Sequence, residues 1–374
     1  MKQQLALKVL GEILGWTEEQ CLKEFAWLEL MSRFKYDDYS DYVAGARFIE
    51  SLVDWLQQFK VQERAAAYQF VRSSLIFFSA TEIQHLVDLV YLETVRPQLL
   101  KTVATQLNIP AYLVWSHPDA EATYKNVLRR SLFLGLSDGA RIDAFRRANT
   151  GIISNEQVVL ATEIGEQKWN NLLKELRIDD SDPAATFSSV FLLDDFVGSG
   201  KTLIREGLEG QSWAGRLPKF WDIIKDRIPT HFAPHYRVYV HHYVATDAAS
   251  RLVSEQFLAA KSSHQNTTWL PDIEFTFGLI LPPTVCVSEQ THPEFMKLIN
   301  TYYDASIEDK HTAVGGGDDV RLGFGQCALP LILEHNTPNN SVALLWAETT
   351  GSKGPAMRPL FRRRQRHTNL GGAE

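Results

Sequence analysis

The residues best suited to chemistry are two adjacent aspartates, Asp194 and Asp195, between an apolar run and a glycine-rich turn. Residues 190–202 read VFLLDDFVGSGKT. The apolar run is typical of a buried strand, and Leu203 and Ile204 indicate that a helix begins after the turn. Carboxylates accept hydroxyl protons in strong hydrogen bonds, and successive backbone amides at a helix N-terminus bind anions. This order of elements predicts a site for a phosphorylated sugar.

Two other interpretations of this stretch fit less well. A nucleotide-binding P-loop has the pattern G-x-x-x-x-G-K-[ST], and its first glycine would fall on Asp195, whose charge would repel bound phosphate. The same strand would also have to be the acidic, magnesium-holding strand of such proteins. A buried strand that merely ends in a polar turn would have to bury two carboxylates, which is costly unless they are paired or hydrogen-bonded.

The stretch resembles the ribose-phosphate motif of type I phosphoribosyltransferases. That motif has four apolar residues, two acids, two apolar residues, two small residues, glycine, any residue, and threonine or serine. Phe196 and Gly198 depart mildly from it. The resemblance implies that Asp194 and Asp195 bind the ribose hydroxyls. It also implies that the 5-phosphate is bound by the residues that follow, namely Val197, Gly198, Ser199, Gly200, Lys201 and Thr202.

Composition limits the classes of protein to which the chain can belong. Its 374 residues carry a net charge of −7, which disfavours general attraction to nucleic acid or to an anionic membrane. The three cysteines are far apart, without the spacing of a disulfide framework or a zinc site. No apolar run approaches the roughly 18 residues of a membrane span. We therefore expect a cytoplasmic protein with no membrane partner.

The chain changes character twice along its length. Residues 1–125 predict a mainly helical N-terminal region, residues 126–347 an α/β domain, and residues 348–374 a basic, disordered tail. Alternating strands and helices favour a parallel sheet covered on both faces, with its ligand at the carboxyl ends of the strands. The predicted fold class is therefore α/β with a parallel sheet, and the resemblance implies that the sheet is of the type I phosphoribosyltransferase kind. The strands are expected at residues 131–136, 190–193, 237–245, 275–281 and 328–333.

The tail is basic between residues 353 and 367 and has no acid between Glu348 and Glu374. Its default interpretation is a solvated segment. The alternative is contact with nucleic acid or with a partner in a larger complex, because clustered lysine and arginine bind phosphate.

A second loop of interest follows the strand at 131–136. Gly135–Gly139 fits the G-x-S-x-G nucleophile elbow, so a serine hydrolase using Ser137 is an alternative, with His235, His242 or His335 as partner. Against this, the preceding 130 or so residues are mostly helical and lack a glycine-rich oxyanion strip. In phosphoribosyltransferases a loop at this position grips the diphosphate. The candidates for that role are Ser137, Asp138, Gly139 and Arg141, because a helix N-terminus and an arginine suit an anion.

Two further groups complete the candidate site. The histidines at 231–242 lack the spacing of a zinc site, so no metal ligand is assigned to the protein itself. Magnesium is expected as the cofactor, carried by the diphosphate of phosphoribosyl diphosphate. Asn336, Asn339 and Asn340 follow the last predicted strand, where they could read a base or acceptor, or equally form a turn.

More of the chain shares this resemblance, over residues 30 to 347. The segments are 47–59, 134–139, Arg146 and Arg147, 190–202, and 337–346. Together they resemble a divergent phosphoribosyltransferase-like family of bacterial conflict systems, with members in anti-phage defence and some beside retron reverse transcriptases. The resemblance implies a protein that binds phosphoribosyl diphosphate or a ribonucleotide and reacts at the anomeric carbon. The alternative is a catalytically inactive ligand sensor or scaffold on the same fold, within a nucleoprotein defence complex.

Overall fold

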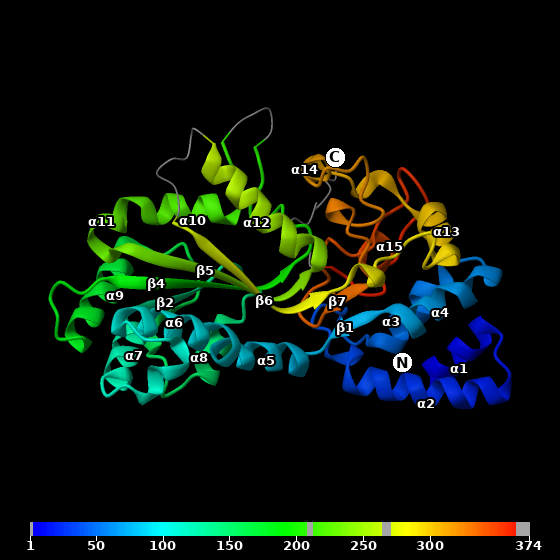
Figure 1. Cartoon of the computed structure of the whole chain (residues 1–374). Helices are drawn as coiled ribbons and strands as arrows, with labels where there is room; N and C mark the ends of the chain where they lie inside the picture. The colour runs from blue at the N-terminus through cyan, green and yellow to red at the C-terminus, as the bar shows by residue number, and fades with distance from the viewer. Residues whose placement is uncertain (1–2, 208–211, 264–270, 364–374) are drawn as a thin grey trace. The chain divides into compact units, whose positions relative to one another are not determined.

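The computed structural model describes residues 3–207, 212–263 and 271–363 (Figure 1). The chain forms two compact units: unit 1 combines residues 1–82 with 283–374, and unit 2 holds residues 83–282. This division differs from the expected one, because the C-terminal quarter packs with the N-terminal helices rather than with the sheet that contains Asp194. No helix in the described ranges is long and apolar enough to cross a membrane.

Unit 2 is built on a five-stranded parallel sheet in the order β3-β2-β4-β5-β6. The α/β fold class with a parallel sheet is therefore confirmed. Four of the five predicted strands lie in this sheet close to their expected bounds. The strands are β2 (Ser131–Gly135), β3 (Val158–Val159), β4 (Phe187–Val197), β5 (Phe232–Thr246) and β6 (Ile273–Leu281).

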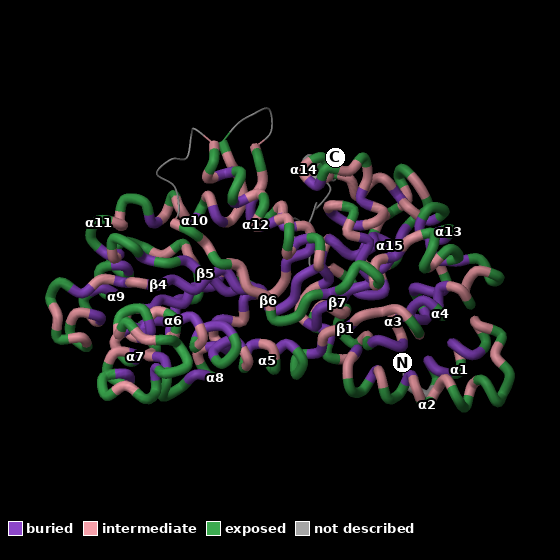
Figure 2. Tube along the Cα trace, in the orientation of Figure 1, coloured by how far each residue is buried: buried purple, intermediate pink, exposed green. Residues whose placement is uncertain are grey.

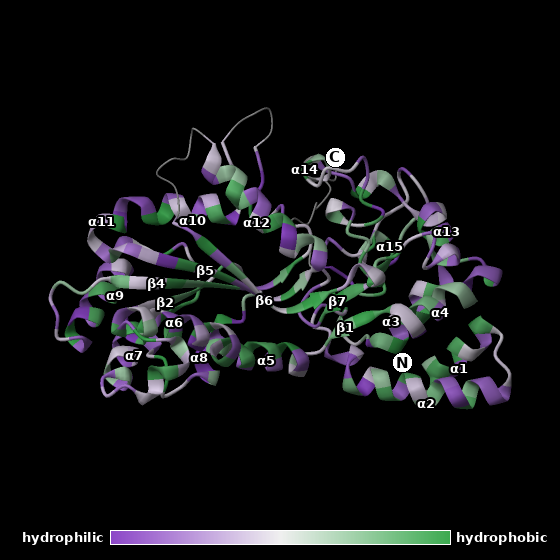
Figure 3. Cartoon of the chain, in the orientation of Figure 1, coloured by the Kyte–Doolittle hydropathy of each residue, from purple (hydrophilic) through white to green (hydrophobic). Residues whose placement is uncertain are grey.

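Helices surround this sheet, which explains why residues 190–193 of the central strand β4 form a continuous apolar run. Strands β4 and β5 are buried over most of their length (Figure 2), and β4 is largely hydrophobic (Figure 3). Trp169, Phe220 and Val253 from three of the helices join Val190 and Leu192 of β4 in one buried cluster. The helical elements of the unit are α5 (Ala80–Leu89), the π-helical η3 (Val90–Val95), α6 (Arg96–Leu107), η4 (Ala111–Ser116), α7 (Ala120–Arg129), α8 (Ile142–Ala148), η5 (Asn155–Gln157), α9 (Glu166–Asp179), α10 (Arg216–Ile224), η7 (Lys225–Arg227), α11 (Ile228–His231) and α12 (Asp247–Ser262).

Aromatic rings link three neighbouring strands of the sheet. Phe133 of β2 stacks on Phe191 of β4 with ring centroids 5.2 Å apart, and Phe191 stacks on Tyr239 of β5 at 4.6 Å. Phe145 of α8 packs on Phe133. Offset stacking adds to the area that these rings bury. The strands that carry the candidate residues are therefore held rigidly side by side.

Unit 1 is mainly helical with one short parallel strand pair. Strand β1 (Ile76–Phe78) pairs with β7 (Leu331–Leu333), so the strand predicted at 328–333 does not join the main sheet. The prediction failed because an apolar run does not reveal its partner strand. The other elements are α1 (Gln3–Leu14), α2 (Glu18–Phe34), η1 (Tyr36–Asp38), α3 (Phe48–Gln57), η2 (Val61–Glu63), α4 (Arg64–Ser74), η8 (Pro283–Val285), α13 (Pro293–Tyr302), η9 (Ala305–Ile307), α14 (Lys310–Val314), η10 (Phe324–Gln326) and α15 (Ala343–Trp346).

Part of the expected tail belongs to the core of unit 1. Met357, Leu360 and Phe361 are buried, and Arg358 pairs with Asp54 of α3 at 2.9 Å. Arg362 pairs with Glu348. Residues 348–363 are thus folded through apolar packing, an ion pair with Asp54 and an ion pair within the segment, contrary to the expected disorder. The rest of the predicted tail, residues 364–374, lies outside the described residues.

Candidate active site at the end of strand β4

The candidate residues gather where the strand order of the sheet reverses. The chain leaves β2 for β3 on one side, and then returns to β4 on the other side of β2. Ligands of open parallel sheets bind at such a switch point, beyond the carboxyl ends of the strands. Ser137 follows β2 and Asp194 lies near the end of β4, and the two side chains are hydrogen-bonded. The topology therefore brings together the two loops that the sequence selected independently.

Asp194 is fully buried, and both of its carboxylate oxygens are engaged. Oδ1 accepts hydrogen bonds from the Ser137 hydroxyl and from the Asp195 amide. Oδ2 forms an ion pair with the guanidinium of Arg216 and lies 3.8 Å from Nε2 of His242. Asp194 thus ties the loop after β2, helix α10 and strand β5 to the end of β4.

Burial dominates the electrostatics of this carboxylate. Desolvation, followed by the charge of Asp195, raises the pKa of Asp194 to about 7, although Arg216 and Ser137 lower it. A buried ion pair often recovers less energy than the desolvation of its charges costs. Ionised Asp194 is consequently a costly group at neutral pH, which is a common property of functional sites.

Two buried histidines on β5 lie beside this cluster. Burial lowers the pKa of His242 to about 3, with Arg216 contributing, and burial lowers the pKa of His241 to about 4. His241 Nδ1 contacts the hydroxyls of Thr94 and Thr276 at 3.2 and 3.0 Å. Both imidazoles are therefore neutral at physiological pH, and His242 acts as a neutral neighbour of Asp194 rather than as its counter-ion.

Asp195 has a different environment from Asp194. It is only partly buried, and its Oδ1 accepts a hydrogen bond from the Phe196 amide at 2.8 Å. The sequence predicted equivalent roles for the two aspartates. In the structure Asp194 is buried and contacts Ser137, Arg216 and His242, whereas Asp195 is partly exposed to solvent.

The turn after β4 has the curvature that the sequence predicted, but it does not open a helix. The amides of Leu203 and Ile204 both donate to the Gly200 carbonyl, at 2.9 and 3.1 Å, which closes one isolated turn. The predicted helix start at Leu203 is therefore wrong. Arg205 instead pairs with Ala214 through two backbone hydrogen bonds of 2.9 Å. The helix begins later, as α10 at Arg216.

The same turn exposes backbone donors that the protein does not use. In the part of the chain that the structure covers, the amides of Ser199, Gly200 and Thr202 donate no hydrogen bond. The Lys201 amide lies 3.4 Å from the Ser199 hydroxyl. Gly200 has φ +74°, and a Cβ on it would lie 2.9 Å from Val253 of α12. Successive unused amides around a left-handed residue form an anion-binding concavity.

Two neighbouring elements fix the turn in place. The Thr246 hydroxyl at the end of β5 donates to the Gly198 carbonyl at 2.6 Å and accepts from the Ala249 amide at 3.0 Å. The one hydroxyl thereby caps the N-terminus of α12 and also holds the turn against the end of β5. On the other side, the Arg216 and Leu217 amides donate to the carbonyls of Thr202 and Leu203 at 3.1 and 3.0 Å.

Gly215 allows the turn and α10 to approach this closely. Its φ is +126°, and a Cβ would lie 2.5 Å from the Leu203 carbonyl oxygen. We expect Gly215→Ala to lower the free energy of unfolding by about 2–3 kcal/mol, because backbone must move. Urea unfolding measures the change. Gly165→Ala is the matched control, since Gly165 also precedes a helix but has no neighbour within 4 Å of its Cβ position. Equal urea midpoints for the two variants would contradict the prediction.

Comparison with known proteins agrees with this geometry. A model of the family described as PRTase-CE matches residues 52–363. The chain belongs to the PRTase-CE family. No curated protein and no solved structure matches it. The match spans residues 52–82 and 283–363 of the discontinuous unit 1 as well as the sheet that carries Asp194. The protein is therefore phosphoribosyltransferase-like, with an α/β fold.

The loop after β2 holds the remaining candidates of unit 2 in this PRTase-CE protein. Asp138 and Gly139 follow Ser137, whose hydroxyl accepts from the Gly139 amide at 3.2 Å. Arg141 has φ +49° and immediately precedes α8. The Tyr243 hydroxyl donates to the Ala140 carbonyl at 2.5 Å and so fixes the loop to β5. The loop is shaped by contacts with the same strands that hold Asp194.

These contacts do not support the serine hydrolase alternative. A catalytic triad places the imidazole between the serine and the acid. Here the Ser137 hydroxyl donates directly to the Asp194 carboxylate. His235 lies near the amino end of β5, opposite the strand ends that carry the site, and His335 belongs to unit 1. Ser137 is better explained as a ligand of Asp194 than as a nucleophile.

The predicted base-binding asparagines are in unit 1, not in the unit that holds Asp194. Asn340 donates from Nδ2 to the Phe324 carbonyl at 2.8 Å, and Asn339 accepts from the Phe324 amide at 2.6 Å. Asn336 exchanges two backbone hydrogen bonds with Leu333. These contacts favour the alternative that they are turn residues, and a role in base binding stays a prediction.

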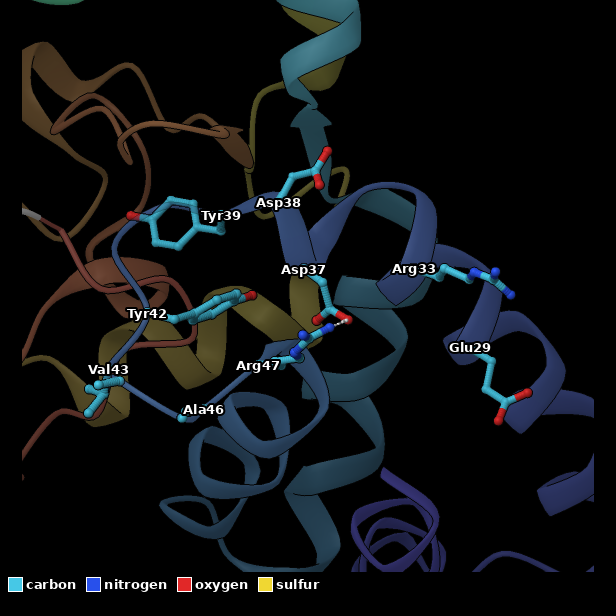
Figure 4. A pocket seen from close by; sticks show the side chains of 11 residues that line it. Glu29, Arg33, Asp37, Asp38, Tyr39, Tyr42, Val43, Ala46 and Arg47 are labelled. Atoms are coloured by element: carbon cyan, nitrogen blue, oxygen red, sulfur yellow. Dashed lines mark ion pairs between the residues drawn. The ribbon is translucent and has the colours of Figure 1, made fainter. Parts of the chain in front are cut away.

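Unit 1 also carries a hollow of about 720 Å³ around residues 29–47 (Figure 4). Asp37 on its wall accepts a hydrogen bond from the Phe48 amide at 3.0 Å and lies 3.7 Å from Arg47. The Tyr39 hydroxyl is engaged with Thr337 at 3.0 Å and with the Arg362 carbonyl. These polar groups stabilise the start of α3 and the C-terminal segment, and so have structural roles.

The structure adds Arg216, which the sequence did not select, and places His242, which the sequence offered only as a partner of Ser137, beside Asp194. Arg216 is 22 residues beyond Asp194, past the Arg205–Ala214 pairing. His242 is opposite Asp194 in the β4–β5 register. Only the parallel register of β5 could have shown that His242 lies beside Asp194. Within residues 3–207, 212–263 and 271–363, no group of three or more histidine, cysteine, aspartate or glutamate side chains could hold a metal ion.

Proposed function

We propose that this protein binds 5-phosphoribosyl 1-diphosphate, or a ribonucleotide, at the end of β4. The observation that carries the proposal is the turn at residues 198–204, whose amides at Ser199, Gly200 and Thr202 donate no hydrogen bond to any residue that the structure describes. They directly follow Asp195, a partly buried carboxylate. The amides suit a 5-phosphate, and the carboxylate suits the ribose hydroxyls. Val197, Gly198 and Lys201 complete the phosphate-binding segment.

The proposed reaction is transfer or cleavage at the anomeric carbon. The bond from C1 to the diphosphate oxygen breaks, both electrons leave with the diphosphate, and an acceptor or water forms the new bond at C1. The residues contribute by positioning the sugar. Asp195 orients the ring, the turn fixes the 5-phosphate, and Arg141 with Ser137, Asp138 and Gly139 faces the leaving group.

Magnesium fits this arrangement as a partner of the substrate. It binds through one or two carboxylates together with phosphate oxygens, and Asp138 and Asp195 are the carboxylates of the site that could contribute. When bound, magnesium would neutralise charge on the departing diphosphate.

Calorimetry with phosphoribosyl diphosphate and magnesium tests the proposal. We expect the wild-type protein to bind, and Gly200→Val to bind at least about tenfold more weakly, because the substitution removes the φ of +74° that the turn requires. Gly151→Val is the control, since Gly151 has φ +85° but no neighbour within 4 Å of its Cβ position. Failure of the wild-type protein to bind would refute the proposal.

A catalytically inactive sensor or scaffold is the second candidate. Full burial of Asp194, with both oxygens engaged, favours it, because one of the two expected sugar-binding carboxylates is not open. For either candidate we propose a role in bacterial anti-phage defence, which rests on the family resemblance. Plaque assays on cells carrying Asp195→Asn separate the two candidates. Loss of protection supports an enzyme if the wild-type protein also releases diphosphate in vitro, because a sensor would lose its ligand as well. Full protection without diphosphate release in vitro supports a scaffold.

A further inference from the structure

Arg216 is the cation closest to the buried aspartate, and it is held there by backbone contacts. It is the first residue of α10, and its amide donates to the Thr202 carbonyl at 3.1 Å. Gly215 before it could not carry a side chain without displacing the Leu203 carbonyl. The position of Arg216 is thus coupled directly to the turn that the proposed function assigns to the 5-phosphate.

The two partners of this ion pair differ in exposure. The Asp194 side chain is 0% exposed, whereas that of Arg216 is 29% exposed. Asp194 also keeps the Ser137 hydroxyl as a second donor, independently of Arg216. Because the Arg216 side chain already reaches solvent, the guanidinium can turn away from Asp194 while the carboxylate keeps the hydrogen bond from Ser137. The guanidinium of arginine donates two parallel hydrogen bonds either to a carboxylate or to a phosphate group. The two anions therefore compete for the same donors.

We propose that Arg216 exchanges Asp194 for the diphosphate of the ligand, and so determines specificity for ligands that carry a diphosphate at C1. The exchange gives the leaving group a bidentate cation. It also frees Oδ2 of Asp194 to accept a ribose hydroxyl, which removes the obstacle that full engagement of Asp194 presents. This inference rests on the proposed function and adds to it a residue far from the motif in sequence.

The test compares three ligands by calorimetry in the presence of magnesium: ribose 5-phosphate, inorganic diphosphate and phosphoribosyl diphosphate. For Arg216→Gln we expect affinity for the two diphosphate ligands to fall about tenfold to hundredfold, because a charged hydrogen-bond pair is lost. Affinity for ribose 5-phosphate should stay within about twofold. Arg216→Lys, which keeps the charge but not the planar fork, should recover part of the loss.

Arg130→Gln is the matched control. Arg130 pairs with Asp180 in the same unit, and its side chain is 27% exposed. It directly precedes β2, at the amino ends of the strands, whereas Asp194 lies near their carboxyl ends. It should leave all three affinities unchanged. Equal losses for ribose 5-phosphate and phosphoribosyl diphosphate in Arg216→Gln, or no loss for either, would overturn the inference alone. If the wild-type protein binds neither sugar phosphate, the proposed function fails and the inference fails with it.

Discussion

Replacing Asp195 with alanine is expected to weaken the binding of phosphoribosyl diphosphate by about a hundredfold while the protein stays folded. A charge-assisted hydrogen bond to a ribose hydroxyl contributes roughly 1.5–3 kcal/mol, and every 1.4 kcal/mol is a factor of ten in affinity, so the upper end of this range corresponds to about a hundredfold loss. Asp195 is only partly buried, so its removal should change the free energy of unfolding by less than about 1 kcal/mol. Calorimetry with magnesium and urea unfolding measure the two quantities.

Asp222→Ala is the control for this prediction. Asp222 lies on α10 in the same unit, its side chain is 66% exposed, and it pairs with Lys225 at 2.8 Å. It should affect neither binding nor stability. Unchanged affinity in Asp195→Ala would show that the partly exposed carboxylate does not contact the sugar.

Replacing Asp194 with asparagine is expected to stabilise the protein at pH 8 and to have little effect on its stability at pH 4.5. The folded-state pKa of Asp194 is about 7, above its ordinary value of 3.8, chiefly because of burial. Between these two values the folded state holds a proton that the unfolded state has lost, so stability falls as the pH rises. Asparagine resembles the protonated carboxyl and does not titrate. The gain at pH 8 should be on the order of 2–4 kcal/mol.

The buried histidines change the pH dependence of the unfolding free energy in the opposite direction from Asp194. The experiment therefore has to separate the two contributions. The pKa values of His241 and His242 are about 4 and about 3, below the ordinary 6.5. The unfolded state therefore binds more protons than the folded state between those values and 6.5, and the histidines destabilise the folded state as the pH falls through that range. Because wild type and Asp194→Asn share both histidines, the difference between their unfolding free energies isolates Asp194. Urea unfolding from pH 4.5 to 8.5 measures it, and a difference that does not vary with pH would contradict the raised pKa.

A charged group that weakens the fold at neutral pH calls for a functional explanation. Groups that destabilise a protein are expected mainly at functional sites, because activity there can depend on a strained or costly arrangement. Asp194 lies at the switch point of the sheet and contacts residues from three other elements. Its cost is consistent with the proposed site, and the pH experiment measures that cost directly.

The strand and the acidic pair were predictable from the sequence because both are local. A run of four apolar residues, two acids and a glycine-rich turn predicts a buried strand that ends in a tight turn, and β4 with residues 198–204 agrees with this prediction, while the anion site itself stays a prediction. The position of the loop at Ser137 was also predictable from neighbouring residues, since the loop directly follows an apolar run. Their contact depends on parallel pairing of β2 with β4, which follows from the α/β pattern once the fold class is known.

The features that the sequence did not reveal depend on contacts between distant residues. The helix was predicted to begin too early because Arg205 and Ala214 pair before α10 begins. The apolar residues at 203 and 204 alone cannot show that the helical hydrogen bonding ends after a single turn. The segment at 348–363 looked disordered from its charge. Arg358 and Arg362 are neutralised by Asp54 and Glu348, partners that composition does not identify.

The most direct test of the account is a crystal structure of the protein soaked with ribose 5-phosphate or with phosphoribosyl diphosphate and magnesium. The account predicts phosphate oxygens at about 3 Å from the amides of Ser199, Gly200 and Thr202, with the ribose hydroxyls directed at Asp195. A sugar phosphate bound elsewhere on the protein, with these amides still unused, would contradict it.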